Sequence, residues 1–309
     1  MRIPDPHAAS SILAIVVLYR CELAHSQSVS SLFRILREHP ELAKHFSLLL
    51  YDNSPQAQDH IMQATFPIDY VHDPSNGGLA TAYNFALARA EAERRTWLLL
   101  FDQDTVLTEE FLFELVESAG TLHGQAQVAA IVPKLLVRGA IYSPEANFLY
   151  QVRHPHLPLQ TVEKDAVGIQ QRHLNAYNSG ATLRVSAMRA IGGFPLQFWL
   201  DYLDHAVFRA LFVGGFRIYV MRAALVHNSS LAEVTSMPLW RLRNILQAQT
   251  LFVKQSGGFL DRMLYRIYLL RFSRGLWKNL KGSQVWKEAA WQALTLRARV
   301  VQGPDGRPR

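Results

Sequence analysis

The sequence Trp97-Leu-Leu-Leu-Phe101 runs directly into Asp102-Gln-Asp104. Five large apolar residues in succession predict a strand that is buried on both faces of a sheet. If the chain stays extended beyond it, Asp102 and Asp104 share one face, where like charges repel unless a cation lies between them. Because Mg²⁺ is typically held by one or two carboxylates and substrate phosphates, the pair predicts a metal and phosphate site. The pattern alone is equally compatible with two aspartates that open a polar loop.

Strand-like and helix-like segments alternate through the first half of the chain. The predicted strands are residues 12–19, 46–51, 97–101 and 128–132, and the predicted helices are residues 26–38, 80–94, 109–119, 184–192 and 201–212. Residues 137–177 read as loops with short antiparallel pieces, and the pattern from residue 239 onward is helical. The alternation indicates an α/β fold with a mostly parallel central sheet flanked by helices, followed by a C-terminal helical extension. Ligands of such sheets bind beyond the carboxyl ends of the strands.

Length and composition indicate a folded globular chain. The chain has 309 residues, of which 49% are hydrophobic and 18% charged, so we expect a sizeable core and no extensive disorder. Cys21 is the single cysteine, which excludes an internal disulfide framework and a cysteine-type zinc site. No uninterrupted apolar run reaches 18 residues, so we predict no transmembrane helix.

Positive charge is concentrated at the C-terminal end. Residues 240–309 contain 14 Lys or Arg and 3 Asp or Glu, a net charge of +11 against +7 for the whole chain, so residues 1–239 carry −4. Such a segment can attract nucleic acid or an anionic membrane surface. Its tryptophans and tyrosines suit interfacial helices, and they equally suit an accessory helical bundle that packs on the preceding domain.

Polar or glycine-rich loops follow the early strands. Tyr19 and Asp52 stand at two strand ends, where an aromatic ring could stack on a base and a carboxylate could accept its N–H, although turn chemistry explains both residues as well. Asn76-Gly77-Gly78 precedes a predicted helix whose N-terminus favours anions, and the alternative is a plain capped loop. Asn84 lies inside that helix, where asparagine is mildly unfavourable, which points to a partner for its side chain.

The second half offers candidates for catalysis and acceptor binding. Loops at residues 178–180 and 192–194 flank a short helix and could shape a pocket. Asp201 is explained by helix capping, whereas Asp204 is not, so Asp204 is the better candidate for a general base. His227 follows an apolar run and could bind metal or phosphate, although a single histidine is more often structural.

These motifs, taken in order, resemble glycosyltransferase family 2, in particular its rhamnosyltransferase-like branch. The resemblance covers about residues 11–230 and rests on the succession of motifs, because no single one is specific. It rests on Val-Val-Leu-Tyr19, Tyr-Asp52-Asn-Ser, Asn76-Gly-Gly, Phe-Asp102-Gln-Asp104, Asn178-Ser-Gly180, Gly-Gly-Phe194, Asp201-Tyr-Leu-Asp204 and Val226-His227.

The resemblance implies a GT-A fold, a nucleoside-diphosphate-sugar donor and a divalent cation, Mg²⁺ or Mn²⁺. By position, the donor-binding residues would be Tyr19, Asp52, Asn76, Gly77, Gly78, Asn84, Asp102, Asn178 and Gly180. Asp104 would bind the metal, with His227 nearby, and Asp204 would be the base. Many relatives carry another acidic residue after the base, where His205-Ala206 stand here, so Asp201 remains an alternative to Asp204.

The expected activity is an inverting, metal-dependent transfer of a sugar, rhamnose in that branch, to a hydroxyl of a glycan or glycolipid in cell-surface polysaccharide synthesis. Residues 1–239 would form the catalytic domain and residues 240–309 the extension. We expect a cytoplasmic enzyme, peripheral on the cytoplasmic face of the inner membrane if the extension binds lipid, and no nucleic-acid partner.

Two other function classes fit the sequence less well. A sugar nucleotidyltransferase needs a glycine-rich, basic loop after the first strand, where the chain has Arg20, Cys21 and Glu22. A nucleic-acid-binding protein that uses the basic C-terminus would carry zinc-finger spacing or an RNP aromatic motif, and neither is present. The sequence also contains no Walker A and no G-x-G-x-x-G motif.

Overall fold

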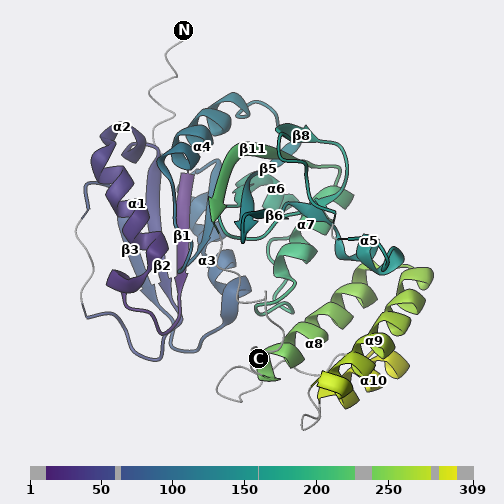
Figure 1. Cartoon of the computed structure of the whole chain (residues 1–309). Coiled ribbons are helices and arrows are strands. Elements are labelled where there is room, and N and C mark those ends of the chain that lie inside the picture. The colour runs from purple at the N-terminus through teal and green to yellow at the C-terminus, as the bar shows by residue number, and fades with distance from the viewer. Residues whose placement is uncertain (1–11, 60–63, 159, 227–238, 280–284, 298–309) are drawn as a thin grey trace.

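A large mixed sheet is the centre of the molecule (Figure 1). The structure is a computed structural model that describes residues 12–59, 64–158, 160–226, 239–279 and 285–297. Nine strands of these residues form the sheet: β1 (Ile12–Leu18), β2 (Phe46–Asp52), β3 (Ile68–His72), β4 (Trp97–Asp102), β5 (Val128–Val137), β6 (Ala140–Ser143), β8 (Gly168–Gln170), β10 (Thr182–Arg184) and β11 (Arg217–Val226). A separate two-stranded ribbon pairs β7 (Glu145–Ala146) with β9 (Leu174–Asn175).

The strand order brings the carboxyl ends of three strands to one edge of the sheet. The order is β3-β2-β1-β4-β10-β5-β11-β8, and β6 pairs with β5. The pairs β1–β2, β1–β4, β2–β3 and β5–β11 are parallel, whereas β6, β8 and β10 run antiparallel to their neighbours. In register, Leu18 lies opposite Asp52 and Val17 lies opposite Asp102. The loops that follow β1, β2 and β4 therefore meet, as expected for the ligand edge of such a sheet.

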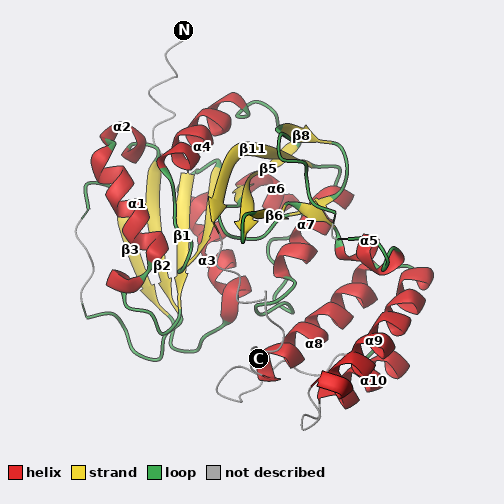
Figure 2. Ribbon diagram, in the orientation of Figure 1, coloured by secondary structure: helices red, strands yellow, loops and turns green. Residues whose placement is uncertain are grey.

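Helices cover both faces of the sheet (Figure 2). Alternate β1 residues point to opposite sides, because successive side chains of a strand do so. Ile12, Ala14 and Val16 belong to a core with α1 (Gln27–Glu38), α2 (Pro40–Ala43) and α4 (Glu109–Thr121). Leu13, Ile15 and Val17 belong to a second core with α3 (Gly78–Ala92), α6 (Val185–Ala190) and α7 (Leu203–Val213). A one-turn 3₁₀ helix, Leu23–His25, precedes α1.

The C-terminal helices extend the second core. They are α8 (Leu239–Ser256), α9 (Phe259–Asn279) and α10 (Val285–Thr295), and they lie beside α5 (Phe148–Arg153) and α7 (Figure 1). Their buried residues Leu242, Phe252 and Tyr265 share one apolar cluster with Phe148 and Leu203. In the parts of the chain that the structure describes, no helix is both long enough and apolar enough to cross a membrane.

The predicted fold is confirmed, with additions. All four predicted strands and all five predicted helices of the first 213 residues exist, with ends displaced by a few residues. Residues 137–177 contain β6 to β9, and β5–β6 and β7–β9 are antiparallel, as expected for that region. The sequence did not predict β3, β10 or α5. Arg184, which was predicted to begin a helix, is instead the last residue of β10.

Candidate active site

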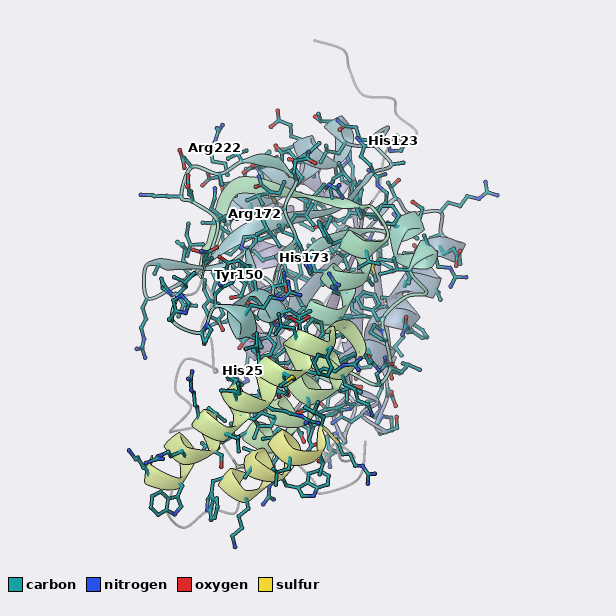
Figure 3. The ribbon with its side chains drawn as sticks, turned by 90° about the vertical axis from the view of Figure 1, so that its right-hand side faces the viewer. His25, His123, Tyr150, Arg172, His173 and Arg222 are labelled. Atoms are coloured by element: carbon teal, nitrogen blue, oxygen red, sulfur yellow. The ribbon has the colours of Figure 1, made fainter. Side chains whose placement is uncertain are left out.

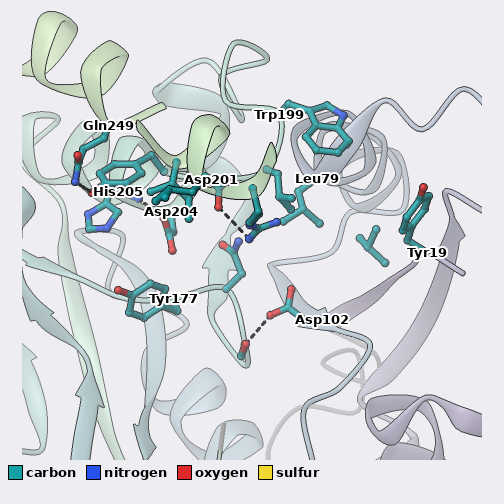
Figure 4. Close-up of a pocket in the computed structure, with 18 of the residues that line it drawn as sticks. Tyr19, Leu79, Asp102, Tyr177, Trp199, Asp201, Asp204, His205 and Gln249 are labelled. Carbon is teal, nitrogen blue, oxygen red and sulfur yellow. Dashed lines mark hydrogen bonds and ion pairs between the residues drawn. The ribbon is translucent and has the colours of Figure 1, made fainter. Parts of the chain in front are cut away.

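A cavity of about 570 Å³ opens where β1, β2 and β4 end (Figure 4). Its polar end comes from the loops after these strands and from the start of α3: Val17, Tyr19, Asn53, Asn76, Gly78, Leu79, Asp102, Gln103 and Asp104. Its other end is rich in aromatic and aliphatic side chains: Tyr142, Tyr177, Leu200, Tyr202, His205, Leu242, Ile245, Leu246, Tyr268 and Phe272. Trp199 lies beside Gly78 and Leu79 at the polar end. Asn178, Ser179, Asp201, Asp204, Arg241 and Gln249 complete the lining.

The polar end presents groups suited to a base and a ribose. The Tyr19 backbone N–H donates to Gln103 Oε1 at 2.9 Å, which ties the loop after β1 to the loop after β4. Asn53 Oδ1 is buried and accepts no hydrogen bond from the described residues, so it is an acceptor left open beside the cavity. An open acceptor at a cavity wall suits a ligand N–H or hydroxyl, because buried polar groups without partners are costly.

Gly78 fixes the turn into α3. Its φ is +83°, and a Cβ built there would lie 2.2 Å from Cδ1 of Trp199, so both the conformation and the space require glycine. The Trp199 indole N–H donates to the Asn76 carbonyl at 3.1 Å, and the Leu79 N–H donates to the Trp199 carbonyl at 2.8 Å. The loop before α3 and the segment before α7 therefore hold each other in place.

Two carboxylates lie at the polar end of the cavity. Asp102 is the last residue of β4, and its Oδ2 accepts a hydrogen bond from Ser179 Oγ at 2.7 Å (Figure 4). Ser28 Oγ donates to the Asp102 carbonyl and, at 2.9 Å, to the Thr105 carbonyl, which shapes the turn that carries Asp104. Asp104 is exposed and lines the same cavity.

This pair fits a hard divalent cation that a phosphate helps to hold. Among the described residues, no group of three or more His, Cys, Asp or Glu is placed to hold a metal by itself. Mg²⁺ and Mn²⁺ accept carboxylate oxygens, and Mg²⁺ commonly takes one or two of them together with substrate phosphates. The donor set Asp102 and Asp104 therefore matches a cation that is completed by a bound diphosphate.

Asp201 and Asp204 lie where α7 begins, separated by a strained residue. Tyr202 has a φ of +62°, which is unusual for a large residue. The Gln249 side-chain amide donates to Tyr202 Oη at 2.7 Å, and the His205 ring stacks on the Tyr202 ring at 4.5 Å. Strain of this kind persists only where the surroundings impose it, and it is common at functional sites. Here α8 helps to hold the conformation that turns both aspartates toward the cavity.

The two aspartates differ in their electrostatic surroundings. Asp201 Oδ1 lies 2.9 Å from the Arg241 guanidinium; burial raises the pKa of Asp201 to about 6 and the cation opposes that shift. Burial raises the pKa of Asp204 to about 7; the His205 N–H lowers it, and the charges of Asp201 and Asp102 raise it further. Asp204 is therefore the stronger base of the two, with a pKa close to neutrality.

The aromatic end contains groups that sequence reasoning missed. Burial lowers the pKa of His205 to about 3, so its ring is neutral, and its Nδ1 has no partner among the described residues. Burial also raises the pKa of Glu145 to about 8, against the effect of the Tyr177 hydroxyl that donates to Glu145 Oε1 at 3.1 Å. The Tyr177 ring in turn stacks on Tyr142, with centroids 5.0 Å apart. Besides these groups, this end of the cavity contains the Arg241–Asp201 ion pair and the Asp204 carboxyl, whose pKa is about 7.

Several predicted site residues lie at the cavity. They are Tyr19, Asn76, Gly78, Asp102, Asp104, Asn178, Asp201 and Asp204. The topology of a parallel sheet predicted that Tyr19, Asn76, Gly78, Asp102 and Asp104 would meet, and the structure places them and the other three around one space. Their roles toward ligands are taken up below.

Other predicted donor-binding residues do not line it. Asp52 is buried beneath the cavity, where its carboxylate accepts hydrogen bonds from Tyr70 Oη, Gln58 Nε2 and the Ser54 N–H, and Asn53 takes the surface position instead. Asn84 was expected to reach a ligand but bonds the backbone N–H and carbonyl of Phe194.

Gly77 and Gly180 also lie off the cavity lining. A Cβ on Gly77 would meet Thr81 at 2.8 Å, and one on Gly180 would meet Pro133 and Leu225 at 3.0 Å, so both glycines serve close packing within the protein. His227 lies outside the residues that the structure describes.

The cavity wall supplied by α8 was also missed. Arg241, Leu242, Ile245, Leu246 and Gln249 recur at the spacing of one helix face, which is a signal the sequence contains. That signal predicts a buried face, and only the tertiary arrangement shows that part of the face covers a cavity.

Comparisons with known proteins bear on the family and the fold. Residues 47–182 match the family model Glycosyl transferase family 2. S. aureus TarS 1–349 has a TM-score of 0.56 and 14% sequence identity, covering 92% of this chain and 78% of that chain. TarS 1–349 in complex with UDP-GlcNAc gives a TM-score of 0.54 at 13% identity, over 92% and 79% of the two chains. No curated protein matches the sequence.

The matched family region runs from β2 to β10 and contains both Asp102 and Asp104. The likeness to TarS, at this identity, shows the shared GT-A type fold. The match favours a sugar-transferring enzyme over the nucleotidyltransferase and nucleic-acid-binding alternatives. Residues 47–182 of the chain thus match a family of glycosyltransferases, and the fold around them is of the GT-A type.

Proposed function

We propose that the enzyme transfers a sugar, with inversion, from a nucleoside-diphosphate sugar to an acceptor hydroxyl. The observation that carries this proposal is one cavity with an acidic pair, Asp102 and Asp104, at its polar end and a near-neutral carboxyl, Asp204, at its aromatic end. In the view of Figure 4, Asp102 lies between Tyr19 and Asp204. The donor thus lies along the ends of β1 and β4, and the acceptor enters between α7 and α8.

Asp204 acts as the general base. Its carboxylate takes the proton of the acceptor hydroxyl while the hydroxyl oxygen forms a bond to C1 of the sugar. The bond between C1 and the diphosphate oxygen breaks on the opposite side, and the nucleoside diphosphate leaves with that electron pair. Asp102 and Asp104 would hold Mg²⁺ or Mn²⁺, which supplies neutralisation of the diphosphate charge when bound.

The donor is proposed first as a class of compound and then as two particular sugars to test. A nucleoside-diphosphate sugar follows from the family match of residues 47–182 and from the groups at the polar end, Tyr19 and Asn53 among them. TarS was solved with UDP-GlcNAc, which makes that donor the first to test, and a rhamnose donor follows from the branch that the sequence resembles.

The acceptor is proposed to be a glycan or glycolipid of the cell surface. Tyr177, Tyr202 and Tyr268 give this end of the cavity aromatic faces on which an apolar sugar face can pack. The reaction would then take place at the cytoplasmic face of the membrane on which such acceptors are assembled.

Donor binding can be tested without knowledge of the acceptor. The melting temperature of the full chain would be followed with UDP-GlcNAc and with a rhamnose nucleotide, each with and without MnCl₂. A bound donor stabilises the folded state by mass action, by about 2.7 kcal/mol at 100 times Kd. We expect a metal-dependent rise with at least one of them.

Asp104→Ala should abolish the metal-dependent part of that rise, because one of the two carboxylates is lost. Asp165→Ala, an exposed aspartate that does not line the cavity, is the matched control and should behave as wild type. An unchanged rise in Asp104→Ala would remove that residue from the metal site. No rise with either donor, or with the free nucleotides UDP and dTDP, would contradict the proposed function.

A further inference from the structure

Helix α9 is apolar on the face that it turns to solvent as well as on the face that it buries. Tyr265, Leu269 and Leu276 are buried against the neighbouring helices. The outward apolar residues, with their exposed fractions, are Phe259 (79%), Leu260 (61%), Met263 (47%), Ile267 (45%), Leu270 (49%) and Trp277 (54%). Their spacing of three and four residues places them in one strip along the helix. Contiguous exposed apolar surface of this kind marks an interaction site.

Basic side chains border this strip on both sides. At about 100° per residue, Arg262 and Arg266 lie along one border, Arg271 and Lys278 along the other, and Arg274 within it. All five are exposed. Asp261, the one acidic residue in the sequence of α9, is buried on the other side of the helix and ion-paired with Arg153 of α5. The outward surface of α9 therefore combines apolar groups with positive charge alone.

We propose that this surface of α9 docks on an anionic lipid bilayer. Apolar side chains flanked by Lys and Arg are the pattern of helices that lie in a membrane interface: the apolar strip enters the acyl boundary and the basic groups reach lipid phosphates. A second copy of the chain fits poorly, because two such surfaces would bring ten positive side chains together without an acidic partner from either helix.

The position of α9 places the proposed lipid surface next to the cavity. Tyr268 and Phe272, on its inner side, line the cavity, so one helix separates the proposed lipid surface from the proposed active site. Figure 3 shows the C-terminal helices in front of the molecule, below His173 and Tyr150, where they are accessible from that side. Lipid docking is a claim separate from catalysis and is tested without an activity assay.

The test is co-sedimentation of the full chain with vesicles of phosphatidylcholine alone and of phosphatidylcholine with phosphatidylglycerol. We expect binding to the anionic vesicles that weakens, without vanishing, when salt is raised. Ile267→Glu/Leu270→Glu should lower the partition coefficient at least tenfold. Arg266→Gln/Arg271→Gln should lower it roughly 25-fold on anionic vesicles only, since each basic group near such a surface contributes about fivefold.

The matched control is Phe113→Glu/Val167→Glu. These side chains are exposed to a similar extent, 41% and 39%, and lie in an acidic surface formed by α4 and the segment before β8. The control should bind vesicles as wild type does. Equal binding by Ile267→Glu/Leu270→Glu would overturn the proposal. So would a wild-type dimer in light scattering that this variant dissociates while no protein sediments with lipid, because the strip would then belong to a second copy.

Discussion

Two aspartates three residues apart at the start of α7, Asp201 and Asp204, have different partners. Asp201 is ion-paired with Arg241 and contributes to the link between α7 and α8. Asp204 is paired with no cation among the described residues; it accepts the N–H of the next residue, His205, and lines the cavity. The distinction comes from Arg241, which lies forty residues beyond Asp201 along the chain.

Replacement of the proposed base, Asp204, is expected to separate donor binding from turnover. Asp204→Asn should lower kcat by about 10²- to 10⁴-fold, the usual contribution of a positioned general base, while the donor-induced rise in melting temperature persists. Asp201→Asn should cost less turnover and more stability, because it leaves Arg241 without its partner. Wild-type kcat/KM should rise tenfold per pH unit below about pH 7 and level off above it, since the base must be unprotonated. A normally active Asp204→Asn enzyme would exclude this residue as the base.

Glu145 predicts a pH dependence of stability. Its pKa is about 8 in the folded protein against an ordinary value near 4.5, so between these limits the folded state holds a proton that the unfolded chain releases. The stability that protonated Glu145 contributes to the folded state is therefore complete below about pH 4.5 and is lost as pH rises to about 8. Glu145→Gln should become more stable relative to wild type over that interval, by roughly 1 to 4 kcal/mol, because one pKa unit corresponds to about 1.4 kcal/mol.

Urea unfolding at pH 5, 7 and 9 measures this difference. The exposed Glu163→Gln is the control and should follow wild type at every pH. A gap between Glu145→Gln and wild type that stays constant with pH would show that Glu145 is ionised in the folded protein.

At the scale of elements, the turn into α3 is the most constrained part of the cavity wall. Gly78→Ala places a methyl group against the Trp199 indole and carbonyl in a left-handed conformation. We expect a loss of about 1 to 3 kcal/mol in the free energy of unfolding and weaker donor binding, because the polar end of the cavity must shift. Gly124→Ala, which meets nothing within 4 Å, should change stability by less than about 0.5 kcal/mol. Similar stability for both variants would contradict this account.

Elements with long apolar runs could be predicted, and short ones could not. Strand β4, Trp97–Asp102, is predicted by its five consecutive large apolar residues. Thr182–Arg184 has three residues, too few for any periodicity, and becomes a strand because β4 and β5 leave a gap that it fills by antiparallel pairing. Its end is held by Arg184, whose guanidinium stacks over Trp97 and donates to the carbonyls of Leu122 and Val128.

For the molecule as a whole, α8 is part of one core with the sheet and its helices. Phe252 is fully buried and its ring lies 5.8 Å from the rings of Tyr202 and His205. Phe252→Ala should lower the stability of the entire chain by about 3 to 5 kcal/mol in a single transition. Phe259→Ala, whose ring is exposed on α9, should be nearly neutral. An early, separate transition of the C-terminal helices in Phe252→Ala would show that residues 240–309 fold as a unit of their own.

The candidate site was predictable as far as sheet topology determines it. Parallel strands carry Tyr19, Asp102 and the 76–78 loop to one edge, so their proximity follows from the alternating pattern. The topology does not say which of two adjacent side chains faces the ligand, and Asn53 rather than Asp52 does so because Tyr70 and Gln58 bind Asp52 from below. The roles of Glu145 and Arg241 could not be predicted from the sequence, because each side chain is surrounded by elements that are distant in sequence.

The two ends of the cavity are encoded far apart. Residues 17–104 supply the polar end, and helices α8 and α9 supply much of the aromatic end, with Asp201 and Asp204 between them. Recombination or mutation could thus change the acceptor while donor binding stays the same, provided that the change is confined to the last quarter of the reading frame. Chimeras joined in the 227–238 segment would be a practical way to retarget this enzyme.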